Sequence, residues 1–343
     1  MRILVLNHAE VEQLLPMAEC IEVMAEALAD LSAGRMHQPL RMVVRPPDAR
    51  GLMGLMPSYR AGGIPTPALS GDEGDGGANA LYGLKAVCVF PGNTAIGKDA
   101  HQGSVMLFSA ETGELLALLN ASAITAIRTG AVSAVATRVL ARPDAGDLAI
   151  LGTGVQARSH LAAMACVRPI RRVRVASRSF EHARAFAQEH AARYSFPIEP
   201  AESAEVVVRG ADLIVTATTA AEPILRHEWI APGAHINAVG SSIPTTREID
   251  TATMAKAELF VDRRESTLNE SGDYLFAMRA GAIGPDHIRA EVGEVLLGKL
   301  PGRSAPEAIT LFKSLGLAVE DLAAADFVYR QAVARGVGTW VEF

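Results

Sequence analysis

The feature that most constrains the fold is a glycine-rich turn near the middle of the 343-residue chain. Residues 147–152 read DLAILG and predict a buried strand, and residues 152–157 read GTGVQA and open a predicted helix. Gly152 permits a tight turn, and Gly154 lets backbone amides approach a pyrophosphate at the helix N-terminus. Ala157 lets the helix pack close to the strand. The segment therefore predicts a dinucleotide-binding unit.

Short apolar runs alternate with helical segments after this turn. The runs RRVRVAS, ADLIVTAT, AHINAVG and AELFVD are typical of strands, and stretches such as VQARSHLAAMACV are typical of helices. Such alternation predicts a doubly wound parallel sheet. We therefore expect an α/β chain in which residues 129–316 form a Rossmann-like domain. The tail from residue 305 is expected to be helical and to add no strand to this sheet.

The first third of the chain has a different pattern. Two helical stretches precede the apolar runs RMVVRP and GLMGLMPSYR, and the runs LKAVCVF, SVMLFSA and LLALLN predict an antiparallel meander. Residues 61–80 concentrate glycine, proline and acids, and predict a surface loop. AITAIRTGAVSAVATRVLA predicts a long connecting helix that ends at Arg142-Pro143. We expect a second, α+β domain that is built from both chain ends, residues 1–128 and 317–343.

Composition excludes several classes of function. The net charge of −6 gives no clustered positive charge for nucleic acid. No apolar run reaches the ~18 residues of a membrane span, and the N-terminus lacks a secretory signal pattern. Cys20, Cys88 and Cys166 are scattered and are interpreted as small buried hydrophobes, so neither a disulfide framework nor a metal site is expected. We therefore predict a cytoplasmic protein without a nucleic-acid or membrane partner.

The residues after the second strand indicate which dinucleotide binds. About 25 residues beyond Gly152, where NAD enzymes usually carry an acidic side chain, the chain reads Ser177-Arg178-Ser179. A guanidinium and two hydroxyls pair well with a 2′-phosphate, which a carboxylate would repel. The sequence therefore favours NADPH without excluding NADH. The alternative is that Arg178 is a solvated charge at a helix start.

Seven motifs follow one another in order along the chain. They are QPLR at 38–41, GLK at 83–85, TAIRT at 125–129, GTGVQA at 152–157, EPIL at 222–225, HINAVG at 235–240 and FKSLG at 312–316. Together they resemble the ornithine cyclodeaminase/mu-crystallin family over nearly the whole chain. The resemblance implies a homodimer with a Rossmann domain and a second domain that carries the dimer interface and the substrate pocket.

The resemblance implies that Arg41, Lys85 and Arg128 hold the α-carboxylate of a substrate or organise the site around it. Lys85 begins the apolar run KAVCVF, and a desolvated cation there needs an anionic partner. Arg128 lies among Ala, Gly and Thr, where a carboxylate or pyrophosphate can approach closely. The alternative for Lys85 and Arg128 is an internal salt bridge with Asp or Glu. Arg45 is an alternative to Arg41.

Further residues match individual positions of the family. Leu315 matches a substrate contact, and the remaining positions match contacts to the dinucleotide. These are Ser104, Arg128, Gly152, Gly154, Val155, Gln156, Thr216 or Thr218, Val239, Gly240 and Ser314. The alternative for each is a loop hydroxyl or a turn at the end of a strand.

The sequence departs from the cyclodeaminases of this family after the HINAVG strand. Those members carry an acid/base aspartate in a GGDxPG-like context, whereas residues 240–244 here read GSSIP and Ser242 takes that place. A serine hydroxyl does not accept a proton at neutral pH as a carboxylate does. Imine reduction asks less of the protein, because it needs an anchored carboxylate, a correctly placed imine carbon and exclusion of water.

We therefore expect NAD(P)H-dependent reduction of a cyclic or open α-imino acid, such as pyrroline- or piperideine-2-carboxylate, to the L-amino acid. In this hypothesis Lys85 and Arg41 bind the carboxylate. Arg128 bridges substrate and cofactor, and Ser242 or water relays a proton. One alternative is an amino-acid dehydrogenase, or an NAD-dependent ornithine or lysine cyclodeaminase, that uses another base. Another is a non-catalytic ligand-binding protein. The candidate alternative bases are Asp262, Glu265 and Asp273.

Overall fold

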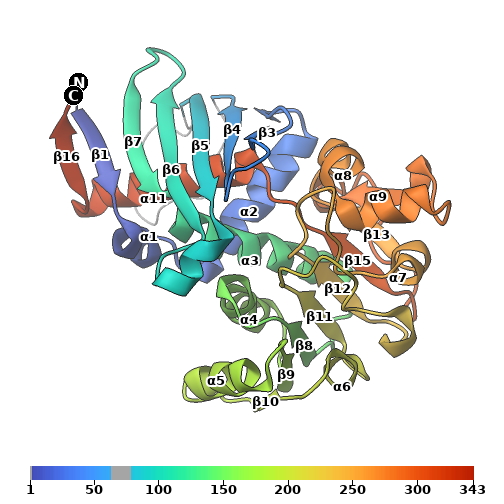
Figure 1. Ribbon diagram of the computed structural model, residues 1–343. Helices are drawn as coiled ribbons and strands as arrows, with labels where there is room; N and C mark the ends of the chain where they lie inside the picture. Colours follow the sequence, from blue (N-terminus) through green and yellow to red (C-terminus); the bar gives the residue numbers. More distant parts are fainter. Residues whose placement is uncertain (1, 63–78) are drawn as a thin grey trace. The chain divides into compact units, whose positions relative to one another are not determined.

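The computed structural model describes residues 2–62 and 79–343. The chain forms two compact units (Figure 1). The first unit comprises Met1–Arg128 and Leu317–Phe343, and the second unit comprises Thr129–Gly316. Most of the segment expected to be an acidic surface loop, residues 61–80, lies outside the described residues.

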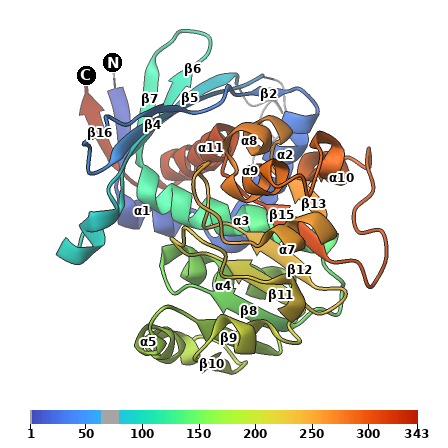
Figure 2. The same cartoon turned by 45° about the vertical axis from the view of Figure 1, so that its right-hand side comes forward.

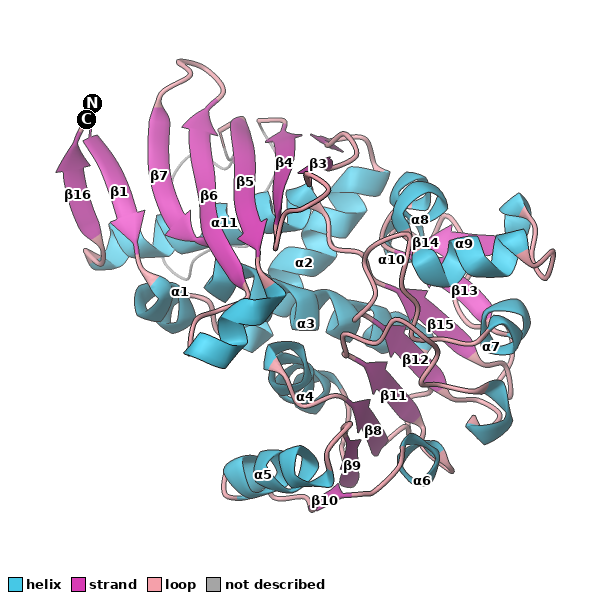
Figure 3. Ribbon diagram, in the orientation of Figure 1, coloured by secondary structure: helices cyan, strands magenta, loops and turns pink. Residues whose placement is uncertain are grey.

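The second unit is built on a parallel sheet with the strand order β10-β9-β8-β11-β12-β15-β13-β14. Four of these strands, β11, β12, β13 and β15, are almost wholly buried, as expected for parallel strands that helices cover on both faces (Figure 3). The strands are β8 (Asp147–Leu151), β9 (Arg172–Ala176), β10 (Ile198–Pro200), β11 (Leu213–Thr216), β12 (His235–Ala238), β13 (Glu258–Val261), β14 (Ile288–Glu291) and β15 (Thr310–Lys313).

Short helices connect these strands. They are α4 (Val155–Val167), α5 (Phe180–Ala191), α6 (Ala204–Val208), α7 (Thr251–Lys256), α8 (Arg264–Glu270), α9 (Gly272–Arg279) and α10 (Val292–Leu296). Three 3-10 turns complete the described helical segments of the chain, η1 (Pro91–Ile96), η2 (His227–Trp229) and η3 (Pro285–His287). The strand order reverses at β8, because β9 and β10 lie on one side of β8 and β11 and β12 lie on the other. This is the switch point at which doubly wound folds bind ligands.

One expectation about this sheet is wrong. The tail was expected to add no strand, but β15 lies between β12 and β13 and pairs with both. Its sequence, TLFK, is only four residues long, so its apolar pattern does not separate a strand from a helix. Its neighbours in the sheet, which are distant in sequence, decide its conformation.

The first unit contains a second sheet with the order β16-β1-β7-β6-β5-β4-β2, and β3 pairs with β4. Strands β5 to β7 form the expected antiparallel meander, and β4 pairs antiparallel with β5. The chain ends meet where β1 pairs with β16 (Figure 1). The strands are β1 (Arg2–Leu6), β2 (Met36–His37), β3 (Met42–Val44), β4 (Leu52–Arg60), β5 (Leu81–Val89), β6 (His101–Ser109), β7 (Leu115–Asn120) and β16 (Thr339–Glu342).

Helix α11 (Ala318–Arg335) packs against β4, β5 and β6, on the side that we call the inner face (Figure 2). It also packs against α2 (Met17–Ser32) and α1 (His8–Leu14). Alternate residues of β4 and β5 point to this face and are buried, among them Met56, Lys85 and Val87. The opposite side is the outer face.

Helix α3 (Ala121–Leu140) is the expected long connecting helix. The side chain of Asn120 accepts a hydrogen bond from the amide of Ala123 at 3.0 Å, which satisfies one of the open donors at its start. The helix is long and apolar enough to cross a membrane, but 72% of its most apolar stretch is buried inside the protein. It is therefore typical of a core helix of a soluble protein.

Candidate functional site

The glycine-rich turn lies at the carboxyl end of β8. Gly152 has a φ of +117°, and a Cβ at this residue would lie 2.4 Å from the carbonyl oxygen of Ala217. Only glycine therefore fits without a shift of backbone. Gly154 is the N-cap of α4, and the space around its Cβ position is open. The turn thus offers the first amides of α4 at the switch point, as a bound pyrophosphate requires.

The first residues of α4 are open on the side of the glycine-rich turn and buried where the helix packs on the sheet. Val155 is exposed, Gln156 is half-buried, and Ala157 is fully buried where a small residue permits close packing of the helix. The residues predicted to contact a dinucleotide through their backbone therefore lie at the open start of the helix. The arrangement fits a dinucleotide, because a glycine cradle and a helix N-terminus meet at one edge of the sheet.

The turn between β9 and α5 carries Ser177, Arg178 and Ser179. The side chain of Arg178 is exposed, and Ser179 occupies the N-cap of α5 without a side-chain capping bond. The hydroxyl of Thr153 lies 3.5 Å from the hydroxyl of Ser177. The structure therefore brings this turn next to the glycine-rich turn, where the adenosine ribose of a dinucleotide binds in a Rossmann fold.

The two threonines predicted to face a cofactor are instead engaged by Glu248, a residue that the sequence analysis missed. Thr216 is fully buried and donates its hydroxyl to Glu248 at 2.8 Å. Of the two predicted alternatives, Thr218 is therefore the less buried one. Thr218 is half-buried and donates both its amide and its hydroxyl to Glu248 at 2.7 Å. No local motif marked Glu248, because its partners lie 8 to 32 residues away in the sequence.

The ends of β12 and β15 carry the other predicted contacts. Val239 and Gly240 follow β12 directly, and Ser314 follows β15. The Ser314 hydroxyl is buried and has no hydrogen-bond partner within residues 2–62 and 79–343. A buried polar atom without a partner is rare and fits a site that a ligand completes. Leu315 is buried beside it.

Of the three carboxylates considered as alternative bases, two are buried in structural contacts and one is exposed. Asp262 is buried and accepts hydrogen bonds from the amides of Leu315 and Gly316 at 2.6 and 2.9 Å, so it anchors the loop after β15. Asp273 is buried and forms an ion pair of 2.9 Å with Lys313. Glu265 is exposed on α8. The structure therefore gives Asp262 and Asp273 structural roles within the second unit.

Ser242, the residue at the place of the cyclodeaminase aspartate, lies in the loop after β12 and is half-buried. The preceding residue, Ser241, donates its hydroxyl to the carbonyl of Thr246 at 2.6 Å and accepts a hydrogen bond from Lys313 at 2.5 Å through its own carbonyl. The loop that carries Ser242 is thus held in place from both sides.

In the first unit, Lys85 lies on the inner face of β5 and is only 3% exposed. Its ammonium donates to both carboxylate oxygens of Asp321 on α11, at 3.1 and 3.2 Å. Arg128 on α3 donates to the same carboxylate at 3.0 Å and to Glu320 at 2.8 Å. The internal salt bridges considered as an alternative are therefore present, and the sequence analysis missed both acids.

Burial and charge shift the pKa values in this cluster in a defined way. Burial lowers the pKa of Lys85 to about 8, against the attraction of Asp321, and the positive charges of Arg128 and Arg41 lower it further. Burial alone would raise the pKa of Asp321, but Arg128 and Lys85 hold it below its ordinary value. Lys85 is thus a cation at neutral pH with a proton that it releases easily.

Arg41 and Ser104 lie in different places relative to this cluster. Arg41 directly precedes β3, whose register places it opposite Met56, and Met56 pairs with Lys85. Ser104 pairs with the residue after Lys85 and therefore points to the outer face. Ser104 and Lys85 therefore lie on opposite faces of the sheet, because a shift of one residue along a strand reverses the face. The predicted contact of Ser104 with the dinucleotide stays a prediction.

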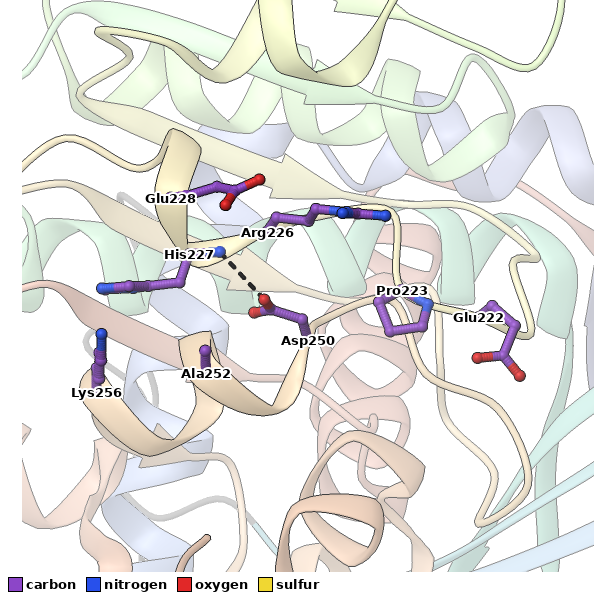
Figure 4. A pocket seen from close by; sticks show the side chains of 8 residues that line it. All are labelled: Glu222, Pro223, Arg226, His227, Glu228, Asp250, Ala252 and Lys256. Atoms are coloured by element: carbon purple, nitrogen blue, oxygen red, sulfur yellow. Dashed lines mark hydrogen bonds between the residues drawn. The ribbon is translucent and has the colours of Figure 1, made fainter. Parts of the chain in front are cut away.

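A separate cleft of about 600 Å³ lies between the segment after β11 and the start of α7 (Figure 4). The Asp250 carboxylate accepts the amide of His227 at 3.4 Å and the amide of Thr253 at 2.8 Å, so it caps α7. Most of its lining residues are charged or titratable, unlike those of most ligand pockets. Its charged and titratable residues are Glu222, Arg226, His227, Glu228, Asp250 and Lys256. None of the residues predicted to bind substrate or cofactor lines it.

Comparison with known proteins places these features in a family. The model of the ornithine cyclodeaminase/mu-crystallin family matches residues 1–336. The chain belongs to this family. A Delta(1)-pyrroline-2-carboxylate reductase of Bacillus cereus is 40% identical over 341 residues, which cover 99% of this chain and 100% of the relative.

Solved structures of family members have the same fold. The Delta(1)-pyrroline-2-carboxylate reductase of Thermococcus litoralis, in complex with NADH and L-proline, has a TM-score of 0.90 at 38% identity and covers 98% of this chain and 99% of its own. An archaeal alanine dehydrogenase dimer with bound NAD has a TM-score of 0.89 at 31% identity and covers 100% of both chains. The family resemblance inferred from the seven motifs is therefore confirmed, as is the Rossmann-like fold class.

Proposed function

We propose that this family member reduces a cyclic or open α-imino acid to the L-amino acid with NAD(P)H. The observation that carries the proposal is the buried Lys85–Asp321–Arg128 cluster, in a chain that also has a dinucleotide turn at the switch point of a Rossmann sheet. The 40% identity to a pyrroline-2-carboxylate reductase over nearly the whole chain supports the substrate class.

The charge of the cluster supports an anionic substrate. Lys85, Arg128 and Arg41 carry three positive charges, and Asp321 and Glu320 carry two negative charges, so these five groups sum to one positive charge. The carboxylate of an imino acid neutralises this remaining charge. Asp321 and Glu320 keep the cations fixed before the substrate arrives, which lowers the entropy lost on binding.

Lys85 is also the residue best suited to deliver a proton. The bound dinucleotide supplies the hydride that reduces the imine carbon. The imine nitrogen must carry a proton in the product, and the ammonium of Lys85, with a pKa of about 8, is a donor matched to neutral pH. Arg128, which has no releasable proton, acts only as an anchor. Ser242 or water completes the relay in this proposal.

The residues after β9 support a preference for NADPH. The exposed guanidinium of Arg178, between Ser177 and Ser179, offers a charged partner for a 2′-phosphate next to the glycine-rich turn. The described residues of this turn include no carboxylate that would bind the 2′-hydroxyl of NADH instead. NADH is accepted more weakly in this proposal.

The outer face of the first unit supports a homodimer. It carries a row of exposed or half-buried apolar side chains, and the rings of Tyr59 and Tyr82 lie on it with centroids 5.0 Å apart. A broad apolar sheet face that residues 2–62 and 79–343 leave without a covering layer is typical of a subunit interface. The members of this face are Met53, Leu55, Tyr59, Tyr82, Leu84, Met106 and Phe108. A second copy of this chain is the proposed occupant.

The proposal is tested by following NADPH oxidation with a panel of imines. The panel contains pyrroline-2-carboxylate, piperideine-2-carboxylate, and the open imines that form from pyruvate with ammonia or methylamine. We expect turnover with at least one cyclic imino acid. Turnover of only the open imine of pyruvate and ammonia would indicate an alanine dehydrogenase. Release of ammonia from ornithine with NAD⁺, without turnover of any imine, would overturn the proposal in favour of a cyclodeaminase, and binding without turnover would indicate a ligand-binding protein.

A further inference from the structure

Glu248 is a buried acid that the proposed reaction does not use. It lies in the loop between β12 and α7, and its side chain is 0% exposed. One carboxylate oxygen accepts the amide and the hydroxyl of Thr218 at 2.7 Å. The other accepts the hydroxyl of Thr216 at 2.8 Å and the amide of Gly240 at 2.7 Å. Four donors therefore converge on a single buried carboxylate.

These donors come from two turns at the carboxyl edge of the sheet. Thr218 belongs to the turn after β11, and Gly240 belongs to the turn after β12. A Cβ at Gly240 would lie 2.2 Å from the carbonyl oxygen of Thr218 and 2.5 Å from Glu248, so the two turns and the carboxylate are in close contact. Glu248 thus fastens the ends of two neighbouring strands to each other.

The turn after β11 also lies in close contact with the glycine-rich turn at the switch point. The carbonyl of Ala217 faces Gly152 so closely that a Cβ there would lie 2.4 Å from it. Ala217 directly precedes Thr218, whose amide and hydroxyl Glu248 holds. The sheet itself joins β11 to β8, since the amide of Ala217 donates to the carbonyl of Leu151 at 2.9 Å. Glu248 holds the next residue of the turn, Thr218, beside the glycine-rich turn at the switch point.

A buried ion pair between Asp273 and Lys313 supports the backbone around Glu248. Asp273 accepts the amides of Glu248 and Ile249 at 2.8 and 3.0 Å and forms an ion pair with Lys313 at 2.9 Å. Lys313 in turn donates to the carbonyls of Ala238 and Ser241, on either side of Gly240. All three charged residues are buried. Buried charges are costly to remove from water. Three of them at one edge are therefore unusual in a sheet that apolar packing alone would hold together.

We propose that Glu248 is a positioning residue for the dinucleotide, and that it keeps the turns after β11 and β12 at the separation that the nicotinamide half requires. The inference rests on the dinucleotide-binding part of the proposed function and on no assumption about the substrate.

A glutamine at this position gives a sharp test. Each oxygen of Glu248 accepts one backbone amide, from Thr218 or from Gly240. The Gln amide nitrogen, in either orientation, faces one of these donors and breaks that contact while the side chain keeps its size. Glu248→Gln is expected to raise the dissociation constant of NADPH about tenfold or more, measured by the fluorescence of the bound nicotinamide without any imino acid. It is also expected to raise the KM for NADPH with a much smaller effect on kcat.

Asp212→Asn is the matched control. Asp212 accepts the amides of Gly146 and Asp147 at 3.0 and 3.1 Å, so it fastens β11 to β8 in the same way at the opposite, amino edge of the sheet. We expect this variant to lower the melting temperature but to change the dissociation constant of NADPH less than twofold. An equal loss of NADPH binding in Asp212→Asn, or unchanged binding in folded Glu248→Gln, would overturn the proposal.

A milder variant covers the case in which Glu248→Gln does not fold. Thr216→Val keeps the shape of a fully buried side chain and removes one of the four hydrogen bonds to Glu248. It is expected to weaken NADPH binding about threefold, and unchanged binding contradicts the proposal. Binding is measured with the dinucleotide alone. A wild-type protein that binds NADPH but reduces no imine would therefore contradict the proposed reaction and still allow the test of Glu248.

Discussion

Lys85 occupies a position on β5 whose inner-face neighbours, Gly83 and Val87, are uncharged. Its charge is maintained by Asp321, which also binds Arg128. Burial works against the charge, and the balance leaves a pKa of about 8. A cation that is fixed in place, and whose pKa lies so near neutral pH, suits both an anchor and a proton donor.

The pH dependence of the reaction follows from this pKa. Lys85 is protonated below about pH 8 and loses its proton above it. We therefore expect kcat/KM for the imino acid to be highest below pH 8 and to fall as the pH rises through 8. Lys85→Arg retains a charge at all of these pH values, so the fall is expected to disappear while kcat drops. A profile that is the same in both proteins would contradict proton donation by Lys85.

Removal of the charge tests the role of Lys85 as an anchor. Lys85→Met is expected to lower kcat/KM about 10- to 100-fold, because a charge-assisted hydrogen bond to the substrate carboxylate is lost. Lys98→Met is the control, because Lys98 is exposed and lies outside the cluster. Steady-state kinetics with pyrroline-2-carboxylate gives the comparison. Equal kinetics of the Lys85 variant and the wild type would remove Lys85 from the site.

At the scale of the elements, the second unit places its ligand-facing groups on short turns after parallel strands. The turns after β8, β9, β11 and β12 each begin within two residues of a strand end, so the hydrogen bonds of the sheet fix their positions. Loops fixed in this way provide a rigid edge for a ligand. In the proposed function, selectivity between dinucleotides depends on single side chains, and Arg178 is the candidate on the turn after β9.

The turn after β9 makes a prediction about cofactor choice. Arg178→Ala is expected to raise the KM for NADPH about tenfold or more and the KM for NADH less than twofold, because only NADPH has the 2′-phosphate. Arg184→Ala, on the helix α5 that follows this turn, is the control, since Arg184 pairs with Glu181 at the surface. Equal changes in both KM values would show that Arg178 does not read the phosphate.

At the scale of the whole molecule, the chain leaves an apolar face that its own described residues do not cover. Tyr82 and Met53 on the outer face are 51% and 44% exposed, and the whole of β3 beside them is exposed. Monomeric soluble proteins rarely expose a continuous apolar patch of this kind. The proposed homodimer would bury it, and an archaeal alanine dehydrogenase that is 31% identical is a dimer.

The dimer is tested by adding charge to this face. The wild type is expected to have twice the 36.2 kDa mass of one chain in light scattering. The double variant Met53→Glu/Tyr82→Glu is expected to have the mass of a single chain, because burying two carboxylates without partners costs several kcal/mol. Val206→Glu, on the exposed face of α6, is the control and should leave the mass unchanged. A dimeric double variant would place the interface elsewhere.

Patterns that are local in sequence predicted a large part of this structure. The meander β5 to β7, helix α3 and the turn from β8 to α4 follow from apolar periodicity and from glycine. The strand β15 was missed because four residues carry too little periodicity, and the outward direction of Ser104 was missed because no motif fixes the register of β6. Cys166 is exposed rather than buried, so its environment also depends on its neighbours in space.

The sequence by itself determined the fold class, the dinucleotide turn and the identity of the cations, because these depend on residue types at short spacings. Only the tertiary structure decided which acids those cations meet. Asp321 lies 236 residues from Lys85, and Glu248 lies 32 residues from Thr216, although each pair is in contact. Contacts over such distances depend on how helices and strands pack. The electrostatics of both sites therefore belong to the folded chain, and no short motif encodes them.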